Sequence, residues 1–368
     1  MIHDGLGLFP TIASYNEVPV MSSSSSNSAS EAPAIRKPYL LFLGDCDDPT
    51  FAKTALGIVQ WAPEDAVGVL TFDGFNLDIG VPSMGVQEAV DRGAGSLLIG
   101  VSAIGGQLLD SWIPVLVEAL HAGLDIVSGL HSRLSDNPAI AEAARATGRQ
   151  LHDVRYPRQQ FPIANGRKRT GKRILTVGTD CALGKKYTAL ALTKAMTDAG
   201  LRATFRATGQ TGILIAGSGI PIDAVVSDFV AGAAETLSPD NDPDHWDVIE
   251  GQGSLFHPAY AAVSLGLLHG SQPDAMVLCH EPNRPHINAY PDYKIPSLTE
   301  AMRRFEDAAR LTNPQSRVVA VSLNTSKLND QDAEAAAKSA EDELGLPVMD
   351  ALRFGSRGVV DKLISDFS

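Results

Sequence analysis

Glycines, an acid and two lysines gather in one short segment whose spacing is typical of a phosphate-binding loop. It lies between an apolar run, Arg173–Val177, and an amphipathic stretch. Backbone N–H groups of such a loop and the N-terminal end of the next helix face an anion, and Lys185 adds a positive charge. The pattern therefore predicts a P-loop that binds a phosphate-bearing ligand through Gly178, Thr179, Asp180, Cys181, Ala182, Gly184, Lys185, Lys186, Tyr187 and Thr188.

Two departures from the common P-loop pattern bear on the ligand. Gly178 lies one residue further from the Gly184-Lys185 pair than usual, and Lys186 stands where nucleotide hydrolases have Ser or Thr. That hydroxyl normally binds Mg²⁺ beside the phosphates. Two lysines without a metal ligand suit a phosphate that is held rather than transferred, which favours coenzyme A over ATP, and no metal site is predicted. Thr188 remains an alternative source of the missing hydroxyl.

The elements before this loop alternate between short apolar runs and helical stretches. This alternation predicts a parallel-sheet α/β domain over residues 34–154 with right-handed crossovers. No Gly-x-Gly-x-x-Gly pattern follows the first strand, so a dinucleotide site there has little support. The expected strands are Tyr39–Leu43, Val67–Phe72, Ser96–Val101 and Asp125–Ser128, and the expected helices are Phe51–Trp61, Gly85–Arg92, Trp112–Ala122 and Pro138–Thr147.

Composition separates the remaining segments. Residues 155–170 are rich in Pro, Arg and Gln and are predicted to be a linker, and residues 171–368 form the P-loop α/β domain. Residues 1–33 contain the serine run Ser22–Ser26 and are predicted to be a disordered tail. Met21, just before that run, is an alternative start of translation.

Net charge and cysteine usage limit the partners. A net charge of −13 argues against nucleic acid and membrane surfaces, because both attract basic proteins. No apolar run reaches the ~20 residues of a membrane helix. The three cysteines are widely spaced, which disfavours a disulfide framework and indicates a cytoplasmic protein. Cys181 is read as a loop-packing residue, with a catalytic thiol as the alternative, and Cys46 and Cys279 are read as packing residues. A homo-oligomer is expected because large α/β enzymes often form one.

The loop and the segments after it resemble two known groups of proteins. Gly178-Thr179-Asp180 and Ile249-Glu250-Gly251 are similar to dethiobiotin synthetase, which implies a Walker-B role for Glu250 and a base-contacting role for Asn324. Together with Ala207–Gly212 and Gln252–Tyr260, they resemble a two-domain family long described only as a domain of unknown function. Its first half is Rossmann-like and its second half is a P-loop domain. Some members are D-glutamate N-acetyltransferases of D-amino-acid catabolism.

The resemblance implies acetyl transfer from acetyl-CoA to the amine of a D-amino acid, with D-glutamate expected. Such a reaction needs a base for the attacking ammonium, and the candidates are Glu250, His257 and His280. An amino-dicarboxylate needs cations, preferably the arginine fork. The candidate substrate ligands are Arg206, Gln210, Thr211 and Arg284.

Two alternatives stay open. The first is an ATP- and Mg²⁺-dependent ligase or kinase of the dethiobiotin synthetase type, which Asp180, Glu250 and Asn324 favour and Lys186 disfavours. The second is a non-catalytic coenzyme sensor. The sequence does not fix the stereochemistry of the acceptor or the role of the first domain.

Overall fold

The computed structural model describes residues 35–49, 51–101, 106–157 and 159–367. The described residues belong to one compact unit. The tail predicted over residues 1–33, and Met21 with it, lies outside the described residues. Among the described residues, no helix combines the length and apolar character needed to cross a bilayer.

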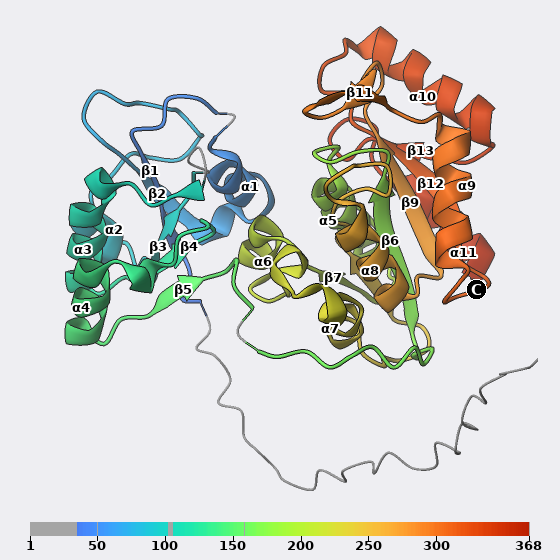
Figure 1. The fold of residues 1–368 in the computed structure, drawn as a ribbon. Helices are drawn as coiled ribbons and strands as arrows, with labels where there is room; N and C mark the ends of the chain where they lie inside the picture. Colours follow the sequence, from blue (N-terminus) through green and yellow to red (C-terminus); the bar gives the residue numbers. More distant parts are fainter. Residues whose placement is uncertain (1–34, 50, 102–105, 158, 368) are drawn as a thin grey trace, which may run out of the picture. The chain divides into compact units, whose positions relative to one another are not determined.

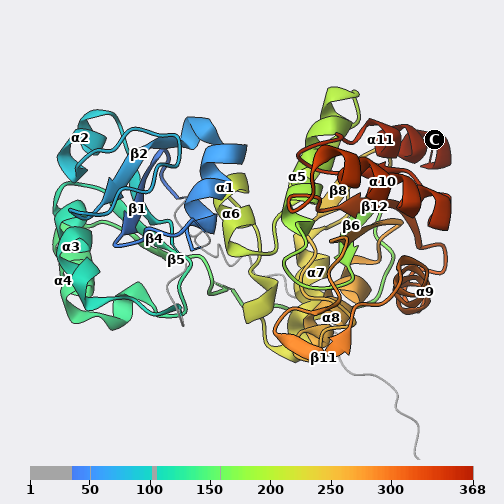
Figure 2. The ribbon, with the colours of Figure 1, turned by 90° about the horizontal axis from the view of Figure 1, so that it is seen from above.

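The first sheet is entirely parallel, with the strand order β2-β1-β3-β4-β5. All six residues of β1 are buried, as expected for the central strand of a sheet covered on both faces. Figures 1 and 2 show α2, α3 and α4 on one face and α1 on the other. The bounds are β1 Tyr39–Gly44, α1 Lys53–Trp61, β2 Ala66–Thr71, α2 Val86–Asp91, β3 Ser96–Ile99, α3 Ile113–His121, β4 Asp125–Ser128, α4 Pro138–Thr147 and β5 Leu151–Asp153.

The second sheet has six parallel strands in the order β13-β12-β9-β6-β8-β7. The bounds are β6 Lys172–Gly178, α5 Lys185–Asp198, β7 Ala203–Arg206, α6 Gln210–Ala216, α7 Val230–Leu237, β8 Trp246–Ile249, α8 Ala261–Ser271, β9 Ala275–His280, α9 Leu298–Ala309, β12 Arg317–Leu323, α10 Asp330–Leu344, β13 Val348–Met349 and α11 Arg357–Phe367. An antiparallel hairpin, β10 (His286–Ile287) and β11 (Tyr290–Lys294), follows β9. Short 3₁₀ turns are η1 Pro63–Asp65, η3 Asp110–Trp112, η4 Leu134–Asp136, η5 Ile222–Ala224 and η6 Ser227–Phe229.

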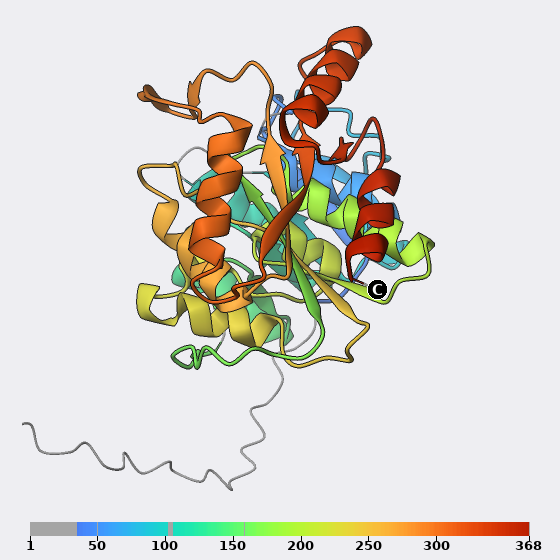
Figure 3. The ribbon, with the colours of Figure 1, turned by 90° about the vertical axis from the view of Figure 1, so that its right-hand side faces the viewer.

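Apolar layers on both faces hold the second sheet. Helices α7, α8, α9 and α10 share one core with the sheet, while α5 and α11 share the other (Figure 3). Ala207, Ile213 and Leu214, on and before α6, join the core of the first sheet instead. The Tyr39 hydroxyl, at the start of β1, donates to the Leu214 carbonyl at 3.3 Å.

The predicted α/β fold with two parallel sheets is confirmed. The strand expected over Ser96–Val101 ends at Ile99, and the short strand β5 was not among the expected strands. Within each parallel sheet, the carboxyl ends of the strands lie along the same edge. Ligands of such sheets bind at that edge.

Candidate functional site

The predicted P-loop connects β6 to α5. Gly184 has φ +97°, a conformation that favours glycine, and Ala182 has φ +53°, so the loop turns tightly before the helix begins at Lys185. The Lys185 side chain is 8% exposed, and its Nζ donates to the Asp180 carbonyl at 2.8 Å. Burial lowers the pKa of Lys185. A lysine that folds onto its own loop can exchange this carbonyl for a ligand oxygen.

Asp180 fastens the loop to the hairpin after β9. Its fully buried carboxylate accepts hydrogen bonds from the Cys181 amide at 2.6 Å, from Arg284 Nη1 at 2.9 Å and from the Asn288 amide at 2.7 Å. Arg284 also donates to the Cys181 carbonyl at 2.9 Å and pairs with Glu281. Hydrogen bonds to charged groups are the stronger ones, so this network fixes the loop conformation.

The hydroxyl of Thr188 contacts β12 and β9. Its Oγ1 lies 2.7 Å from Ser322 Oγ, and Cys279 Sγ donates to it at 3.5 Å within the sheet. Thr179 Oγ1 in turn lies 3.0 Å from His280 Nδ1, so the loop also contacts the end of β9. Burial and the charge of Arg284 lower the pKa of His280.

Glu250 follows β8 and lies 4% exposed beside the start of α6. Its Oε2 accepts from the Thr208 amide at 3.0 Å and the Gly209 amide at 3.1 Å. Burial raises the pKa of Glu250 despite these bonds. A Cβ at Gly212 would come within 2.3 Å of Oε2, so only glycine leaves room for this carboxylate.

The backbone next to Glu250 is packed just as tightly. A Cβ built at Gly251 would lie 1.7 Å from the Thr176 carbonyl oxygen of β6 and 3.1 Å from Cδ of Lys185. The Gly251 amide also donates to Thr176 Oγ1 at 2.9 Å. This close approach brings the turn after β8 against the stem of the P-loop lysine.

Lys186 has different surroundings from Lys185. Burial lowers its pKa to about 8, and the nearby carboxylate of Glu250 opposes that shift. Its Nζ lies 4.5 Å from the centre of the Tyr187 ring, which stacks on Trp61 of α1 at 5.9 Å. The ammonium therefore lies between an aromatic ring and a buried acid.

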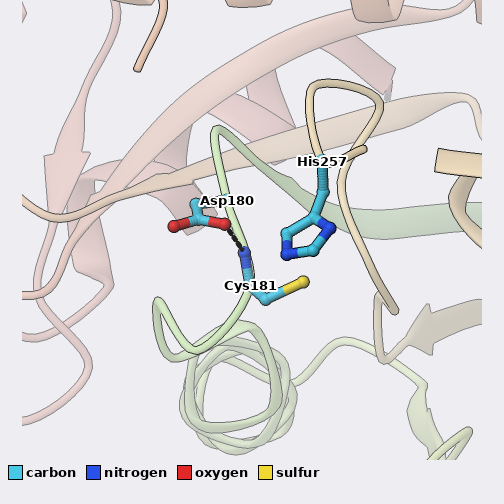
Figure 4. A group of neighbouring side chains, drawn as sticks. All are labelled: Asp180, Cys181 and His257. Atoms are coloured by element: carbon cyan, nitrogen blue, oxygen red, sulfur yellow. Dashed lines mark hydrogen bonds between the residues drawn. The ribbon is translucent and has the colours of Figure 1, made fainter. Parts of the chain in front are cut away.

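His257 lies against the other side of the loop (Figure 4). Its Nδ1 accepts from the Ala259 amide at 3.2 Å, and its ring stacks on Tyr260 with centroids 4.5 Å apart. Accepting at Nδ1 places the proton of the neutral ring on Nε2, an inferred tautomer in which Nε2 is a donor. Burial raises the pKa of Cys181, contrary to the lowered thiol pKa that a helix N-terminus would give.

Ligand atoms of Asp180, Cys181 and His257 lie within 4.8 Å of one another, a spacing that a metal ion requires (Figure 4). The Asp180 carboxylate, however, already accepts three hydrogen bonds, one from a guanidinium. An adjacent positive charge disfavours a cation there, so the arrangement suits an anion better.

A cavity of about 570 Å³ opens beside Cys181. Its volume falls within the range of small-molecule sites. Its lining includes the apolar residues Ile222, Val225, Val230 and Val263 and the polar residues His131, Arg155, Asp223, Gln252 and Tyr260. A smaller cavity of about 170 Å³ is lined by Gly184, Tyr187 and Asn324, among others. Residues of the loop therefore line two cavities.

Some predicted ligands lie elsewhere. Arg206 Nε donates to Asp247 at 2.8 Å, near the start of β8, away from the P-loop. Thr211 packs on α1, its Oγ1 3.4 Å from Thr54 Oγ1. Gln210 faces Arg155, with its amide assigned so that the oxygen points to the guanidinium.

The sequence analysis did not identify Arg155, Asp223, Gln252 or Tyr260 as site residues. Arg155 was assigned to the linker. No motif or periodicity marks Arg155 or Asp223, whereas Gln252 and Tyr260 belong to a segment that carries the family resemblance. For Arg155 and Asp223 the only signal available was the charge of Arg155 directly after β5.

Comparison with known proteins gives a consistent result. Residues 162–360 match the family model described as a domain of unknown function, the DUF1611 P-loop domain, and residues 72–157 match the DUF1611 Rossmann-like domain. A D-glutamate N-acetyltransferase of Tritonibacter scottomollicae is 51% identical over 89% of this chain and 99% of its own length. Another from a Pseudoalteromonas species is 44% identical over the same shares. The crystal structure of a DUF1611 family protein from Anabaena variabilis has a TM-score of 0.81 at 33% identity, covering 90% of this chain and 100% of that one.

Proposed function

The chain belongs to the DUF1611 family, and we propose that it is an N-acetyltransferase that moves the acetyl group of acetyl-CoA to the amine of D-glutamate. The observation that carries this proposal is the 51% identity to a D-glutamate N-acetyltransferase over 99% of that protein's length. The chain spans both domains of such a relative.

The chemistry of the loop supports acetyl-CoA as the donor. Lys185 and Lys186 supply two cations at the start of α5, and the hydroxyl of Thr188 is bonded to Ser322. A hydroxyl ligand for Mg²⁺ is therefore missing from its usual position, while the loop amides and lysines fit a phosphate handle. The hollow beside Asn324 would take the adenine end, and the thioester would extend toward Cys181.

In this reaction the amine nitrogen forms a bond to the acetyl carbonyl carbon, and the thioester C–S bond breaks. The ammonium loses two protons on becoming an amide: one ends on the coenzyme thiolate and the other passes through the base to solvent, so the step needs no further reactant. Glu250 is our first candidate for the base, because its raised pKa brings a carboxylate closer to the range that proton transfer favours. The N–H groups of the loop and His257 Nε2 are candidates to stabilise the oxyanion.

Steady-state assays of the purified protein test the proposal. We expect thiol release from acetyl-CoA that depends on D-glutamate and persists in EDTA, and mass spectrometry should identify N-acetyl-D-glutamate. Glu250→Gln should lower kcat by about 100-fold, the usual contribution of a positioned base, with little change in the KM for acetyl-CoA. Absence of thiol release with D-glutamate and every other amino acid would overturn the proposal.

An ATP-dependent ligase or kinase is the second candidate, since Glu250 follows β8 at the position of a Walker-B acid. Production of ADP that requires a carboxylate substrate and Mg²⁺ would select it.

The free state of Cys46, Cys181 and Cys279 supports the cytoplasm as the place of the reaction. Sedimentation of the purified protein would test the expected homo-oligomer.

A further inference from the structure

The cavity beside Cys181 contains one arginine–aspartate pair. Arg155 follows β5, and Asp223 lies in η5, so the pair joins segments that are distant in sequence. Arg155 Nη2 and Asp223 Oδ2 are 3.4 Å apart, with side chains 18% and 37% exposed. We propose that this pair binds the zwitterionic head of the acceptor amino acid, its α-carboxylate on Arg155 and its α-ammonium on Asp223. The inference rests on the proposed function.

Arg155 is held in place while retaining donors for a ligand. The amide oxygen of Gln210 lies 2.6 Å from Nη1, 2.8 Å from Nη2 and 3.0 Å from Nε. This partner is neutral, and the contact with Asp223 is a single one at 3.4 Å. A guanidinium has five N–H donors in a planar fork that matches a carboxylate. Gln210 does not neutralise the charge of Arg155, so the guanidinium can still bind a carboxylate.

The opposite charges of the pair select which carboxylate of a dicarboxylic amino acid binds. In an α-amino acid the carboxylate and the ammonium are attached to one carbon, so their charges lie as close together as those of Arg155 and Asp223. A side-chain carboxylate has no such ammonium beside it and would face Asp223 with the same sign of charge. Like charges at this separation repel. The pair therefore fits the α-carbon end of the acceptor.

The rest of the cavity fits the remainder of such a ligand. The apolar residues of its lining, Ile222, Val225, Val230 and Val263, offer contact to methylene groups. Cys181 of the P-loop lines the same cavity, so an acetyl group delivered along the loop arrives where the amine would be held. The ammonium and the donor thus meet in one hollow.

The test compares three acceptors: D-glutamate, 4-aminobutyrate, which lacks the α-carboxylate, and D-glutamine, which lacks the side-chain charge. Arg155→Gln should lower kcat/KM for D-glutamate by about 10- to 100-fold through KM, as expected for a lost charged hydrogen bond. The value for 4-aminobutyrate should stay within about twofold, and the KM for acetyl-CoA should not change. Arg155→Lys should restore part of the loss, and Asp223→Asn should weaken all three acceptors.

Arg202 and Asp244 provide the matched control, because they form an exposed arginine–aspartate pair at 3.1 Å outside the cavity. Arg202→Gln and Asp244→Asn should leave all three acceptors unchanged. An equal loss for D-glutamate and 4-aminobutyrate in Arg155→Gln would overturn the assignment. So would a loss of discrimination between D-glutamate and D-glutamine, which would place the side-chain carboxylate on Arg155.

Failure of the proposed function is seen separately, as a wild-type protein that does not acetylate D-glutamate. In that case calorimetric titration of the same three compounds into the coenzyme A-loaded wild type and Arg155→Gln judges the pair by itself. Binding of D-glutamate that the substitution weakens at least tenfold supports the assignment, and equal binding by both proteins overturns it.

Discussion

In the six-stranded sheet, the amino ends of the strands (the amino edge) and their carboxyl ends (the carboxyl edge) both have buried charged side chains. The two edges differ in what those side chains bind. At the amino edge Arg173 is completely buried, and its guanidinium donates to the carbonyls of Ser238, Pro239 and Thr170, among others. Nearby, Arg206 pairs with Asp247 at 2.8 Å. These arginines hold chain segments together: Arg173 donates to several backbone carbonyls, and Arg206 Nε donates to Asp247.

At the carboxyl edge Lys185 and Lys186 keep donors that a ligand can use. Lys185 has one bond, to its own loop at 2.8 Å, and Lys186 lies over a ring beside Glu250. A buried charge alone is therefore a poor marker of function, because structural ion pairs are buried too. The better marker is a charge whose hydrogen-bonding capacity the fold leaves partly unused.

Arg173→Met should have the largest effect and should act on stability alone. The carbonyls of Ser238, Pro239 and Thr170 would lose their donor in a buried setting, which costs about 3–5 kcal/mol. Urea unfolding measures the change, with the exposed Arg202→Met as control. Native-like stability of Arg173→Met, or coenzyme affinity lost in the folded fraction, would contradict the division between the two edges.

Lys185→Ala should weaken coenzyme binding rather than stability. We expect the affinity for acetyl-CoA to fall by about 10- to 100-fold, since a charged hydrogen bond contributes about 1.5–3 kcal/mol, while stability changes little. Lys194→Ala is the control on the same helix, because that lysine is 71% exposed and pairs with Asp198. Calorimetric titration measures both. Undiminished affinity in Lys185→Ala would remove the loop from the binding site.

The pH dependence of Lys186 sharpens the comparison and should have the smallest effect. Its pKa of about 8 lies below the ordinary 10.5, so the folded protein binds fewer protons than the unfolded chain between these values. The free energy of unfolding should therefore gain from this group as the pH rises from 8 to 10.5, and the protonated lysine destabilises the fold below pH 8.

Coenzyme binding should show the opposite trend. As the pH rises from 7 to 9, Lys186 loses its charge, and we expect the Kd for coenzyme A to increase several-fold. Lys186→Met should show a smaller dependence, and Lys194→Met should behave as the wild type. Equal slopes in the wild type and Lys186→Met would show that Lys186 does not face the phosphates.

The fold could be read from the sequence because its signals are local. Apolar runs such as Tyr39–Leu43 predict buried strands, and the Gly178–Lys185 spacing predicts the loop between β6 and α5. The cavity could not be read in this way. Arg155 and Asp223 are 68 positions apart in irregular segments, and only packing brings them to 3.4 Å.

Side-chain direction was equally inaccessible. Arg206 ends β7, where its position suggested a ligand at the carboxyl edge, yet its guanidinium pairs with Asp247 near the other end of the neighbouring strand. Thr188 was an alternative metal ligand, but its hydroxyl bonds to Ser322. Such a side chain can reach more than one set of partners, and which set it contacts depends on neighbours from other strands.

The turn at Gly251 has a consequence for how this family can diverge. Any added side-chain carbon would overlap the Thr176 oxygen at 1.7 Å, so no substitution can be absorbed by moving a flexible neighbour. A residue with a side chain can replace Gly251 only if β6 shifts as well. Because β6 leads directly into the P-loop, such a shift would also move the loop. Selection that preserves the coenzyme site should therefore also preserve glycine at position 251.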